Sequence, residues 1–373
     1  MRIAFDARPL LGQRTGVSVW LEGLLRGLAA ATDWRFVLCL PRAAASLGVD
    51  DLVERCEVLA PAIGRPGTVW LHTAAASLAA GRADVWVGTL GVLPRRLTIP
   101  AVLAVHDLTP RSRPQQHTPA NRFCFNAYFE ESAACADALV CVSAATLAAL
   151  AAVLPQAARR AEVIREGVDP FFSPGGDAGE ARETALRFAG GRTFIVQLGT
   201  LEPRKGIATL LAAHAALLRA DRAAPDLVLA GAPGWGGGWL ARALAAHPER
   251  ARVHLPGYVS REDARALLRH AELGVLASEE EGFGLPLAEA LACGAACVVS
   301  DAAALVEVAG GAARRFRRGE AAALAEALTA ALRPEERERL RAAARRRAGA
   351  LGWAEPLAAW RRLLARVAEP PRR

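Results

Sequence analysis

The sequence predicts an α/β protein with two domains, each a doubly wound parallel sheet covered by helices. Three observations favour this fold class. Short apolar segments of strand length alternate with stretches in which apolar residues recur at helical spacing. Loops that contain glycine follow several of these segments, as they do where a parallel strand turns into a helix. The chain has 373 residues, 53% of them apolar, which suggests two domain cores rather than one.

The first half of the chain alternates between segments of strand length and helical stretches. The predicted strands are residues 2–7, 35–40, 57–59, 85–87, 101–105, 138–142 and 162–164. A loop containing Gly12 and Gly16 separates the first strand from a helical stretch. These glycines fit either a plain strand-to-helix turn or a loop whose backbone N–H groups face a ligand. Their spacing is not a dinucleotide-binding fingerprint.

Polar residues follow two of these strands. His106 and Asp107 come directly after residues 101–105, and the carboxyl end of a parallel strand is where such sheets bind ligands. The alternative is a structural pair or a helix cap. Ser143 is expected to cap a helix over 144–153. Residues 109–122 contain three prolines and no periodicity, which predicts a long surface loop that shapes a substrate site.

The domain boundary is expected where large apolar residues become rare and glycines accumulate. Residues 173–192 fit this description and are the predicted linker between domains at 1–172 and 193–354. A last helix, at about 355–367, has an apolar face that needs a partner. We expect this C-terminal segment, 355–373, to complete the first domain.

The second half repeats the alternation of strands and helices. Its predicted strands are residues 193–198, 227–230, 252–255, 273–276 and 296–300. Its predicted helices are residues 207–219, 261–270, about 320–332 and 335–348. Residues 231–239 contain five glycines and predict a flexible loop.

One basic residue differs from all the others. Of 46 basic residues, 45 are arginine and one is Lys205, in the loop G-T-L-E-P-R-K-G before a helix. A lysine is a compact charge that reaches a phosphate where a planar guanidinium does not fit. Chance placement is the alternative.

The stretch from Ser278 to Gly294 combines a carboxylate run, a glycine turn and an apolar helix. Gly282 and Gly284 allow a tight turn, and a helix that starts near Pro286 would present its N-terminus to an anion. Carboxylates are not placed beside phosphates, so Glu281 and Glu289 are expected to face hydroxyl groups of a sugar and a ribose. The alternative is an ordinary strand-to-helix connection with surface glutamates.

Net charge and composition exclude some classes of protein. The charge of +8 fits a solvated arginine-rich surface, or attraction to a nucleoside diphosphate or an anionic membrane face. Aromatic residues make up 6% of the chain and are not interleaved with basic ones, which argues against nucleic-acid binding. There is no apolar run of membrane-spanning length, and Asp6 and Arg8 interrupt any N-terminal signal sequence. Irregularly spaced cysteines favour the cytoplasm and indicate no metal site.

Six motifs in order give the chain a family resemblance. After D-A-R-P-L and the glycine loop come H-D-L, V-S-A-A-T-L, G-V-D-P-F-F-S-P, G-T-L-E-P-R-K-G, P-G-Y-V-S and E-G-F-G-L-P-L-A-E-A-L-A-C-G. The chain resembles the retaining glycosyltransferases of family 4, also called glycosyl transferases group 1, and within them mannosyltransferases. The resemblance implies the GT-B fold, two Rossmann-like domains facing across a cleft. It also implies a nucleoside-diphosphate sugar donor, a glycan or lipid-linked acceptor, and no metal or other cofactor.

The resemblance also implies roles for particular residues. Arg204 and Lys205 would bind the donor diphosphate, Glu281 the transferred sugar and Glu289 the ribose. His106 would contact the sugar near the reacting carbon. The remaining implied donor contacts are Gly12, Gly16, Thr200, Tyr258, Val259, Gly282, Phe283, Gly284 and Leu285.

The chain departs from the family pattern in a few places. Arg165 and Glu166 stand where Pro-Asn is usual, and Ala296 stands where a proline is typical. Rival functions are a nucleotide-sugar 2-epimerase of the same fold, a sugar phosphorylase, a catalytically silent scaffold and a basic nucleic-acid binder. Peripheral binding to an anionic membrane is a further possibility, through arginines at positions 95, 96, 111, 113, 159 and 160, although scattered solvated arginines explain them too.

Overall fold

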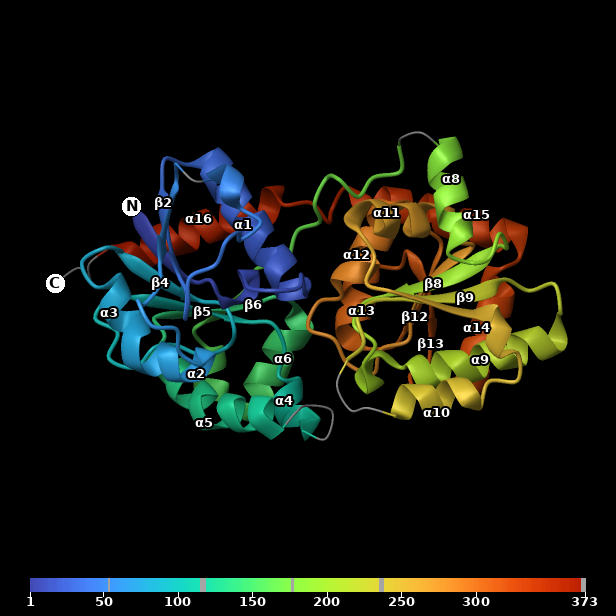
Figure 1. Cartoon of the computed structure of the whole chain (residues 1–373), viewed down its shortest axis with the longest axis horizontal. Helices are drawn as coiled ribbons and strands as arrows, with labels where there is room; N and C mark the ends of the chain where they lie inside the picture. Colours follow the sequence, from blue (N-terminus) through green and yellow to red (C-terminus); the bar gives the residue numbers. More distant parts are fainter. Residues whose placement is uncertain (53, 115–118, 176–177, 235–237, 370–373) are drawn as a thin grey trace. The chain divides into compact units, whose positions relative to one another are not determined.

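The computed structural model describes the chain except residues 53, 115–118, 176–177, 235–237 and 370–373. The chain forms two compact units (Figure 1). The first unit comprises Met1–Gly167 and Trp353–Arg373, and the second comprises Val168–Gly352. Each unit is an α/β domain with a parallel sheet, which confirms the predicted fold class.

A seven-stranded parallel sheet forms the centre of the first unit. Its strands are β1 (Arg2–Asp6), β2 (Arg35–Cys39), β3 (Cys56–Leu59), β4 (Val85–Gly88), β5 (Ala101–Val105), β6 (Ala138–Cys141) and β7 (Ala161–Val163). They lie in the order β3-β2-β1-β4-β5-β6-β7. The helical segments are η1 (Arg8–Leu10), α1 (Gly16–Ala31), η2 (Asp50–Leu52), α2 (Gly67–Trp70), η3 (Leu71–Ala75), α3 (Ala76–Ala79), α4 (Thr109–Ser112), α5 (Pro119–Cys135), α6 (Ala144–Val153), α7 (Pro155–Ala158) and α16 (Ala354–Ala368).

Both faces of this sheet are buried. Alternate residues of each strand point to opposite faces, so that Ile3 and Phe5 join one core whereas Ala4 joins the other. The first core includes Trp20 of α1, and the second includes Phe129 of α5. Continuous apolar strands are therefore required here, as they are in any parallel sheet covered on two sides.

The C-terminal helix α16 returns to the first unit, as the sequence predicts. Its apolar face, with Trp360 and Leu363, is buried in the core beside α1 (Figure 1). Two glycines of α1 permit this approach. A Cβ atom at Gly27 would lie 2.4 Å from Leu357, and one at Gly23 would lie 2.4 Å from the ring of Trp353. A side chain at either position would require Leu357 or Trp353 to move.

A six-stranded parallel sheet forms the centre of the second unit. Its strands are β8 (Phe194–Leu198), β9 (Asp226–Ala230), β10 (Val253–Gly257), β11 (Leu273–Leu276), β12 (Cys297–Ser300) and β13 (Ala313–Phe316). Their order is β10-β9-β8-β11-β12-β13, the doubly wound order of a Rossmann sheet. The helical segments are α8 (Ala178–Arg187), η5 (Pro203–Lys205), α9 (Ile207–Ala220), α10 (Trp239–Ala245), η6 (Arg250–Arg252), α11 (Arg261–His270), α12 (Leu285–Ala292), α13 (Ala303–Ala309), α14 (Ala321–Ala331) and α15 (Pro334–Ala348).

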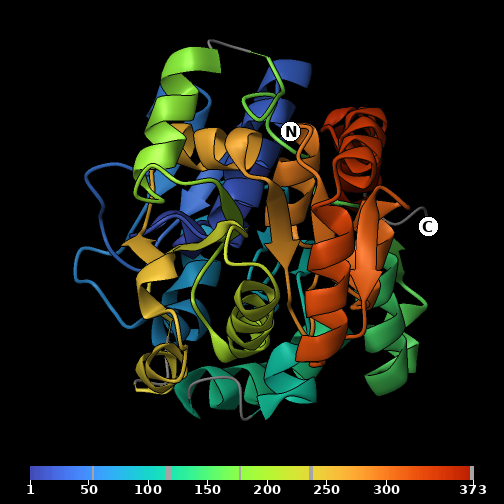
Figure 2. The same cartoon turned by 90° about the vertical axis from the view of Figure 1, so that its right-hand side faces the viewer.

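Two predictions about irregular segments are wrong. Residues 173–192 are not a linker, because they contain α8, which packs against α11 in the second unit (Figures 1 and 2). The chain passes between units earlier, at Gly167 and Val168. The predicted loop 109–122 is helical at both ends, because α4 occupies Thr109–Ser112 and α5 begins at Pro119, while its residues 115–118 lie outside the described part of the chain. Pro110 and Pro119 lie in the first turns of these helices, where a proline does not interrupt a helix.

Every predicted strand is present, and its ends differ by at most two residues. The sequence did not reveal β13, whose residues Ala313–Phe316 include two arginines and lie at an edge of the sheet. It also missed α10 and α13. Part of the predicted flexible loop 231–239, at 235–237, lies outside the described residues. No described helix combines the length and apolar character that a membrane span requires.

Candidate functional site

Two loops of the second unit meet at the carboxyl ends of adjacent strands. One follows β8 and carries Arg204 and Lys205, and the other follows β11 and carries Glu281. Gly206 makes their approach possible: its φ is +67°, and a Cβ atom there would lie 1.9 Å from the carbonyl oxygen of Ala277. No residue with a side chain fits this position without moving one of the loops.

Lys205 and Glu281 form a buried ion pair where these loops meet. The Lys205 Nζ lies 2.6 Å from Glu281 Oε1, and their side chains are 14% and 7% exposed. Arg204 reaches the other carboxylate oxygen at 3.5 Å and also pairs with Glu202, its Nε 2.8 Å from a Glu202 oxygen. Ser278 donates a hydrogen bond of 2.7 Å from its hydroxyl to Glu281 Oε1. Two cations and one hydroxyl therefore hold a single carboxylate.

Burial and charge together set the ionisation of this pair. Burial lowers the pKa of Lys205 below its ordinary value, and the charge of Arg204 acts in the same direction while Glu281 opposes it. Burial alone would raise the pKa of the Glu281 carboxyl, but Lys205 and Arg204 outweigh burial and hold that pKa below its usual range. Glu281 is thus a stable anion held by two cationic side chains, and Arg204 is shared between Glu281 and Glu202.

A buried glutamine fixes the two loops from below. The Gln197 amide donates a hydrogen bond of 3.1 Å to the Lys205 carbonyl, and its oxygen accepts from the Ala277 N–H at 3.4 Å. The Glu279 N–H donates to the Arg204 carbonyl at 2.9 Å. These contacts hold the two loops, and hence their charged side chains, in a fixed arrangement, which is the preorganisation that a binding site needs.

The helix predicted after the glycine turn is present and starts at Leu285. Gly284, with φ +98°, is its N-cap, and Pro286 occupies the first turn. Phe283 is buried, and Glu289 lies half-buried inside the helix. The N-terminus of α12 therefore follows the Glu281 loop directly, and helix N-termini favour anions.

Three further predicted donor residues, Thr200, Tyr258 and Val259, lie in the second unit, whereas Gly12 and Gly16 lie in the first. Thr200 follows β8, whereas Tyr258, which is 51% exposed, and Val259 follow β10. Both loops leave the carboxyl ends of strands, as do the loops of Lys205 and Glu281. Sequence reasoning missed the roles of Ser278 and Gln197; Ser278 lies within the motif itself, whereas a lone glutamine in an apolar strand was the only indication for Gln197.

In the first unit, His106 follows β5 and is held on three sides. Its Nδ1 lies 3.0 Å from an oxygen of Glu166, and its ring meets the edge of Trp20 with centroids 4.6 Å apart. The Thr146 hydroxyl donates to its carbonyl at 3.3 Å. Asp107 instead accepts hydrogen bonds from Thr109 at the start of α4. His106 and Asp107 thus have separate partners: His106 binds the Glu166 carboxylate, and Asp107 accepts hydrogen bonds at the start of α4.

The glycine loop of the first unit leads into α1. Gly12 has φ +87° with open space where a Cβ atom would be, and Gly16 is the first residue of the helix. Between them, Arg14 forms an ion pair with buried Glu22, its Nε 2.9 Å from Glu22 Oε1. The predicted cap Ser143 accepts a hydrogen bond of 3.0 Å from the Thr146 N–H, which confirms its role at α6.

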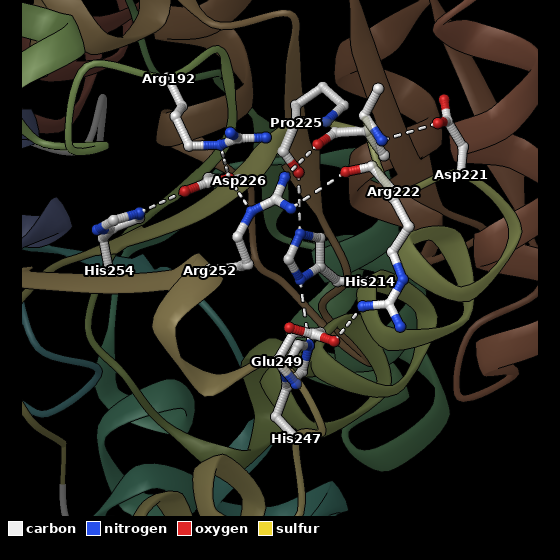
Figure 3. A network of polar contacts seen from close by, with 12 residues as sticks. Arg192, His214, Asp221, Arg222, Pro225, Asp226, His247, Glu249, Arg252 and His254 are labelled. Atoms are coloured by element: carbon white, nitrogen blue, oxygen red, sulfur yellow. Dashed lines mark hydrogen bonds and ion pairs between the residues drawn. The ribbon is translucent and has the colours of Figure 1, made fainter.

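A second polar network of the second unit lies at the opposite ends of its strands (Figure 3). Asp226, buried at the start of β9, binds Arg192 at 2.9 Å, His254 at 2.8 Å and also Arg252. Burial would raise the pKa of this carboxyl, but hydrogen bonds from these three residues lower it. Ligands of such sheets bind at the carboxyl ends of the strands, so we assign this network to stability.

Two histidines beside this network have their tautomers fixed by hydrogen bonds (Figure 3). His247 Nδ1 accepts from the Glu249 N–H at 3.2 Å, so its Nε2–H donates to His214 Nδ1, also at 3.2 Å. His214 Nε2–H then donates to the Pro225 carbonyl at 3.0 Å. Burial lowers the pKa of His214 to about 4. Both rings are therefore neutral at neutral pH.

Comparison with known protein families divides the chain in the same way as its fold. Residues 14–170 match the family described as Glycosyltransferase Family 4. Residues 180–347 match the family described as Glycosyl transferases group 1. The first match falls within the first unit except for its last residues, and the second falls within the second unit.

Curated relatives match part of the chain. O-antigen chain mannosyltransferase B of Escherichia coli is 37% identical over 117 residues, 31% of this chain and 31% of the relative. The serotype-specific mannosyltransferase WbdA of Escherichia coli is 30% identical over 200 residues, 51% of this chain and 24% of the relative. The chain thus spans about a third and about a quarter of the length of these relatives.

Solved structures match nearly the whole chain. HepE of Anabaena, in complex with UDP-glucose, has a TM-score of 0.76 and 18% identity, with coverage of 98% of this chain and 100% of that one. WaaG, a glycosyltransferase involved in lipopolysaccharide biosynthesis, has a TM-score of 0.75 and 17% identity, with coverage of 96% and 98%. These likenesses show the GT-B fold. The two family matches, which together span both units, show that the chain belongs to the glycosyltransferases, with a first unit of the Glycosyltransferase Family 4 type and a second unit of the glycosyl transferases group 1 type.

Proposed function

We propose that the protein transfers a hexose from a nucleoside-diphosphate sugar to a hydroxyl group of a glycan or lipid-linked acceptor, with retention of configuration at the anomeric carbon. The observation that carries this proposal is the buried cluster of Lys205, Arg204 and Glu281 beside the N-terminus of α12. It combines cationic groups for a diphosphate with a carboxylate for sugar hydroxyls at the carboxyl ends of two central parallel strands.

The positive groups support departure of the diphosphate. As the glycosidic bond breaks, negative charge grows on the leaving phosphate oxygen, and Lys205, Arg204 and the α12 N-terminus stabilise that charge increasingly. We propose that these groups act in place of a divalent metal. Glu281 holds Lys205 and Arg204, so that binding of a diphosphate would redistribute contacts that these side chains already make.

The remaining assignments keep the roles that the family resemblance implies. Glu281 accepts hydrogen bonds from hydroxyl groups of the transferred sugar, and Glu289 from those of the ribose. Tyr258 and Val259 lie along the base. The proposed backbone and side-chain contacts to donor are completed by Thr200, Gly282, Phe283, Gly284 and Leu285. In the first unit, Gly12 and Gly16 offer backbone N–H groups to the substrate, and His106 contacts a sugar.

The proposed stereochemistry follows from the family resemblance. The acceptor hydroxyl attacks the anomeric carbon on the face from which the diphosphate leaves. A bond forms between the acceptor oxygen and this carbon as the bond to the phosphate oxygen breaks. The departing phosphate oxygen takes the acceptor proton, so that no enzyme carboxylate is needed as a nucleophile.

Mannose is the first choice for the transferred sugar, because both named curated relatives are mannosyltransferases. A UDP-hexose is the second choice, since the neighbour HepE binds UDP-glucose. GDP-mannose and UDP-glucose are therefore the first donors to compare. We propose the cytoplasm as the compartment, because the six described cysteines are free thiols.

A donor screen tests the proposal. The full chain is incubated with GDP-mannose or UDP-glucose, with and without hydroxyl acceptors, and free nucleotide and products are measured. Release that depends on acceptor, unchanged by a chelator of divalent metals, supports metal-independent transfer. Loss of activity with the chelator contradicts the metal-independent part alone.

The other outcomes of this screen identify the rival functions. Conversion of the sugar to its 2-epimer indicates an epimerase, and binding of UDP or GDP without turnover indicates a silent scaffold. Binding of duplex DNA in preference to nucleotides indicates a nucleic-acid binder. Each of these results would overturn the proposed transfer.

A further inference from the structure

The His106 ring is fixed by neighbours that come from distant parts of the first unit. His106 follows β5, Trp20 belongs to α1, and Glu166 follows β7, 60 residues after the histidine. The ring planes of His106 and Trp20 meet at 82°, and Trp20 itself packs against Trp360 with centroids 6.0 Å apart. Trp20 and Trp360 are fully buried, so one edge of the imidazole packs against the domain core.

Glu166 is a carboxylate in a place where burial makes a carboxylate costly. Its side chain is 6% exposed, and its described partner is the Nδ1 of His106 at 3.0 Å. A buried carboxylate is retained only where a hydrogen-bond donor compensates for lost hydration. The family resemblance implies no role for Glu166.

This contact decides which nitrogen of the imidazole carries the proton. An ionised carboxylate can accept but cannot donate a hydrogen bond, so the proton of a neutral His106 lies on Nδ1. The lone pair is then on Nε2. That nitrogen is buried and has no hydrogen-bond partner among the described residues. A buried acceptor without a partner is costly unless another molecule supplies the donor.

We infer that Glu166 is a positioning residue that fixes His106 in the Nδ1–H tautomer, so that Nε2 accepts a hydrogen bond from a hydroxyl group of the sugar substrate. This inference rests on the proposed transfer for the identity of the ligand. The tautomer itself does not depend on that function. Glu166 acts through His106 and touches no reacting atom.

The first experiment measures the tautomer directly. Long-range 1H–15N correlation spectra of the 15N-labelled protein distinguish the two tautomers of each histidine ring, and a His106→Asn variant identifies the signals of His106. The wild-type ring is expected in the Nδ1–H form. Glu166→Met removes the acceptor at similar side-chain length and should shift His106 toward the Nε2–H form. Glu166→Gln, whose amide oxygen accepts the same N–H, should restore the wild-type pattern.

The second experiment measures turnover with the donor found in the screen. Loss of a partner that orients a functional histidine lowers activity by about 10-fold to 100-fold, and we expect this fall in kcat for Glu166→Met with little change in KM. Glu166→Gln should retain most of the activity. In a His106→Asn background, Glu166→Met should have no further effect beyond about twofold, because the two residues act as one unit.

A matched control removes a neighbouring carboxylate. Glu162, on β7, pairs with Arg366 at the surface, and its side chain is 45% exposed. Glu162→Met should leave the His106 signals and kcat unchanged. Circular dichroism and thermal unfolding of each variant show whether it has folded.

The outcomes separate this inference from the proposed function. The inference is overturned if wild-type His106 is in the Nε2–H form, or if Glu166→Met does not change the His106 tautomer, even if transfer is observed. Additive losses in the double variant would also overturn it, because they would show that Glu166 acts independently of His106. Absence of turnover with every donor, together with the expected tautomers, contradicts the proposed function and leaves the positioning role in place.

Discussion

Each unit holds a buried carboxylate against a basic side chain at the carboxyl ends of parallel strands, but the two pairs differ in kind. Glu281 of the second unit, 7% exposed, is held by Lys205 and Arg204. Glu166 of the first unit, 6% exposed, is hydrogen-bonded to the imidazole ring of His106. The Glu281 cluster brings three charged side chains together, whereas the Glu166 contact orients an imidazole ring. The two sheets therefore differ in function: the second places cations where they can stabilise an anion, and the first places a ring nitrogen where it can form a hydrogen bond.

The largest effect should come from removing the concentrated charge. Lys205→Ala is expected to lower turnover about 10²-fold to 10³-fold, as does the loss of one preorganised group that stabilises transition-state charge. Glu281 keeps Arg204 and Ser278 as partners, so the variant should fold. Nucleotide release measures the effect, and Arg222→Ala, at an exposed ion pair with Glu249, is the control. Turnover near that of wild type would remove Lys205 from the diphosphate site and break the comparison.

A second histidine sharpens the comparison through its response to acid. His106 has a carboxylate partner, whereas buried His214 has His247 as its partner and Arg252 nearby. The pKa of His214 falls from 6.5 to about 4 on folding, so between these values the unfolded chain binds more protons. Stability is therefore complete above about pH 6.5 and is lost as the pH falls toward 4, by about 3 kcal/mol in total.

Urea unfolding between pH 7.5 and 4.5 measures this loss. His214→Gln should be less stable than wild type at neutral pH but should lose less stability on acidification. If the two proteins lose equal stability, the His214–His247 pair does not govern the acid response. Acid-sensitive groups elsewhere would then account for it.

The roles of the two acids in the donor site can be separated. Glu281→Gln is expected to keep nucleotide binding and to lower transfer about 10-fold to 100-fold, the effect of losing a charge-assisted hydrogen bond to a sugar hydroxyl. Calorimetric titration with GDP and UDP measures binding, and nucleotide release measures transfer. If the variant instead loses nucleotide binding while the sugar still contributes to donor affinity, the roles of Glu281 and Glu289 in our assignment must be exchanged.

The smallest effect is expected at Gly12, a loop glycine of the first unit that compares with Gly206 of the second. Gly206 and Gly12 both have positive φ, +67° and +87°, but only Gly206 would bring a Cβ atom against a backbone carbonyl. Gly12→Ala should cost about 1 kcal/mol for the left-handed backbone. Gly206→Ala should cost about 2 kcal/mol more because of overpacking. Thermal unfolding of both variants measures these losses of stability. Equal losses would mean that the loops near Lys205 move to accommodate the added methyl group at little cost.

The sequence predicted much of the second unit's site because its residues lie in local motifs. Lys205 differs in type from every other basic residue, and Glu281 lies in a glycine turn that begins a helix. Their contact at 2.6 Å joins residues 76 positions apart, yet each was visible by itself. Glu166 gave no such indication, since nothing in R-E-G-V marks a carboxylate that will meet a histidine after β5. The helical character of 178–187 was also hidden, because glycines around it resembled a linker.

The sequence by itself determined the period of most elements, many of the places where strands turn into helices, and the types of charged group in the loops that follow. It did so because strand alternation, helix caps and glycine turns depend on residues a few positions apart. Only the tertiary structure decided that Glu166 holds His106, that Ser278 and Gln197 support the Lys205 pair, and that α8 packs against α11. Strand order and register bring such partners together, and these arise from packing over the whole domain.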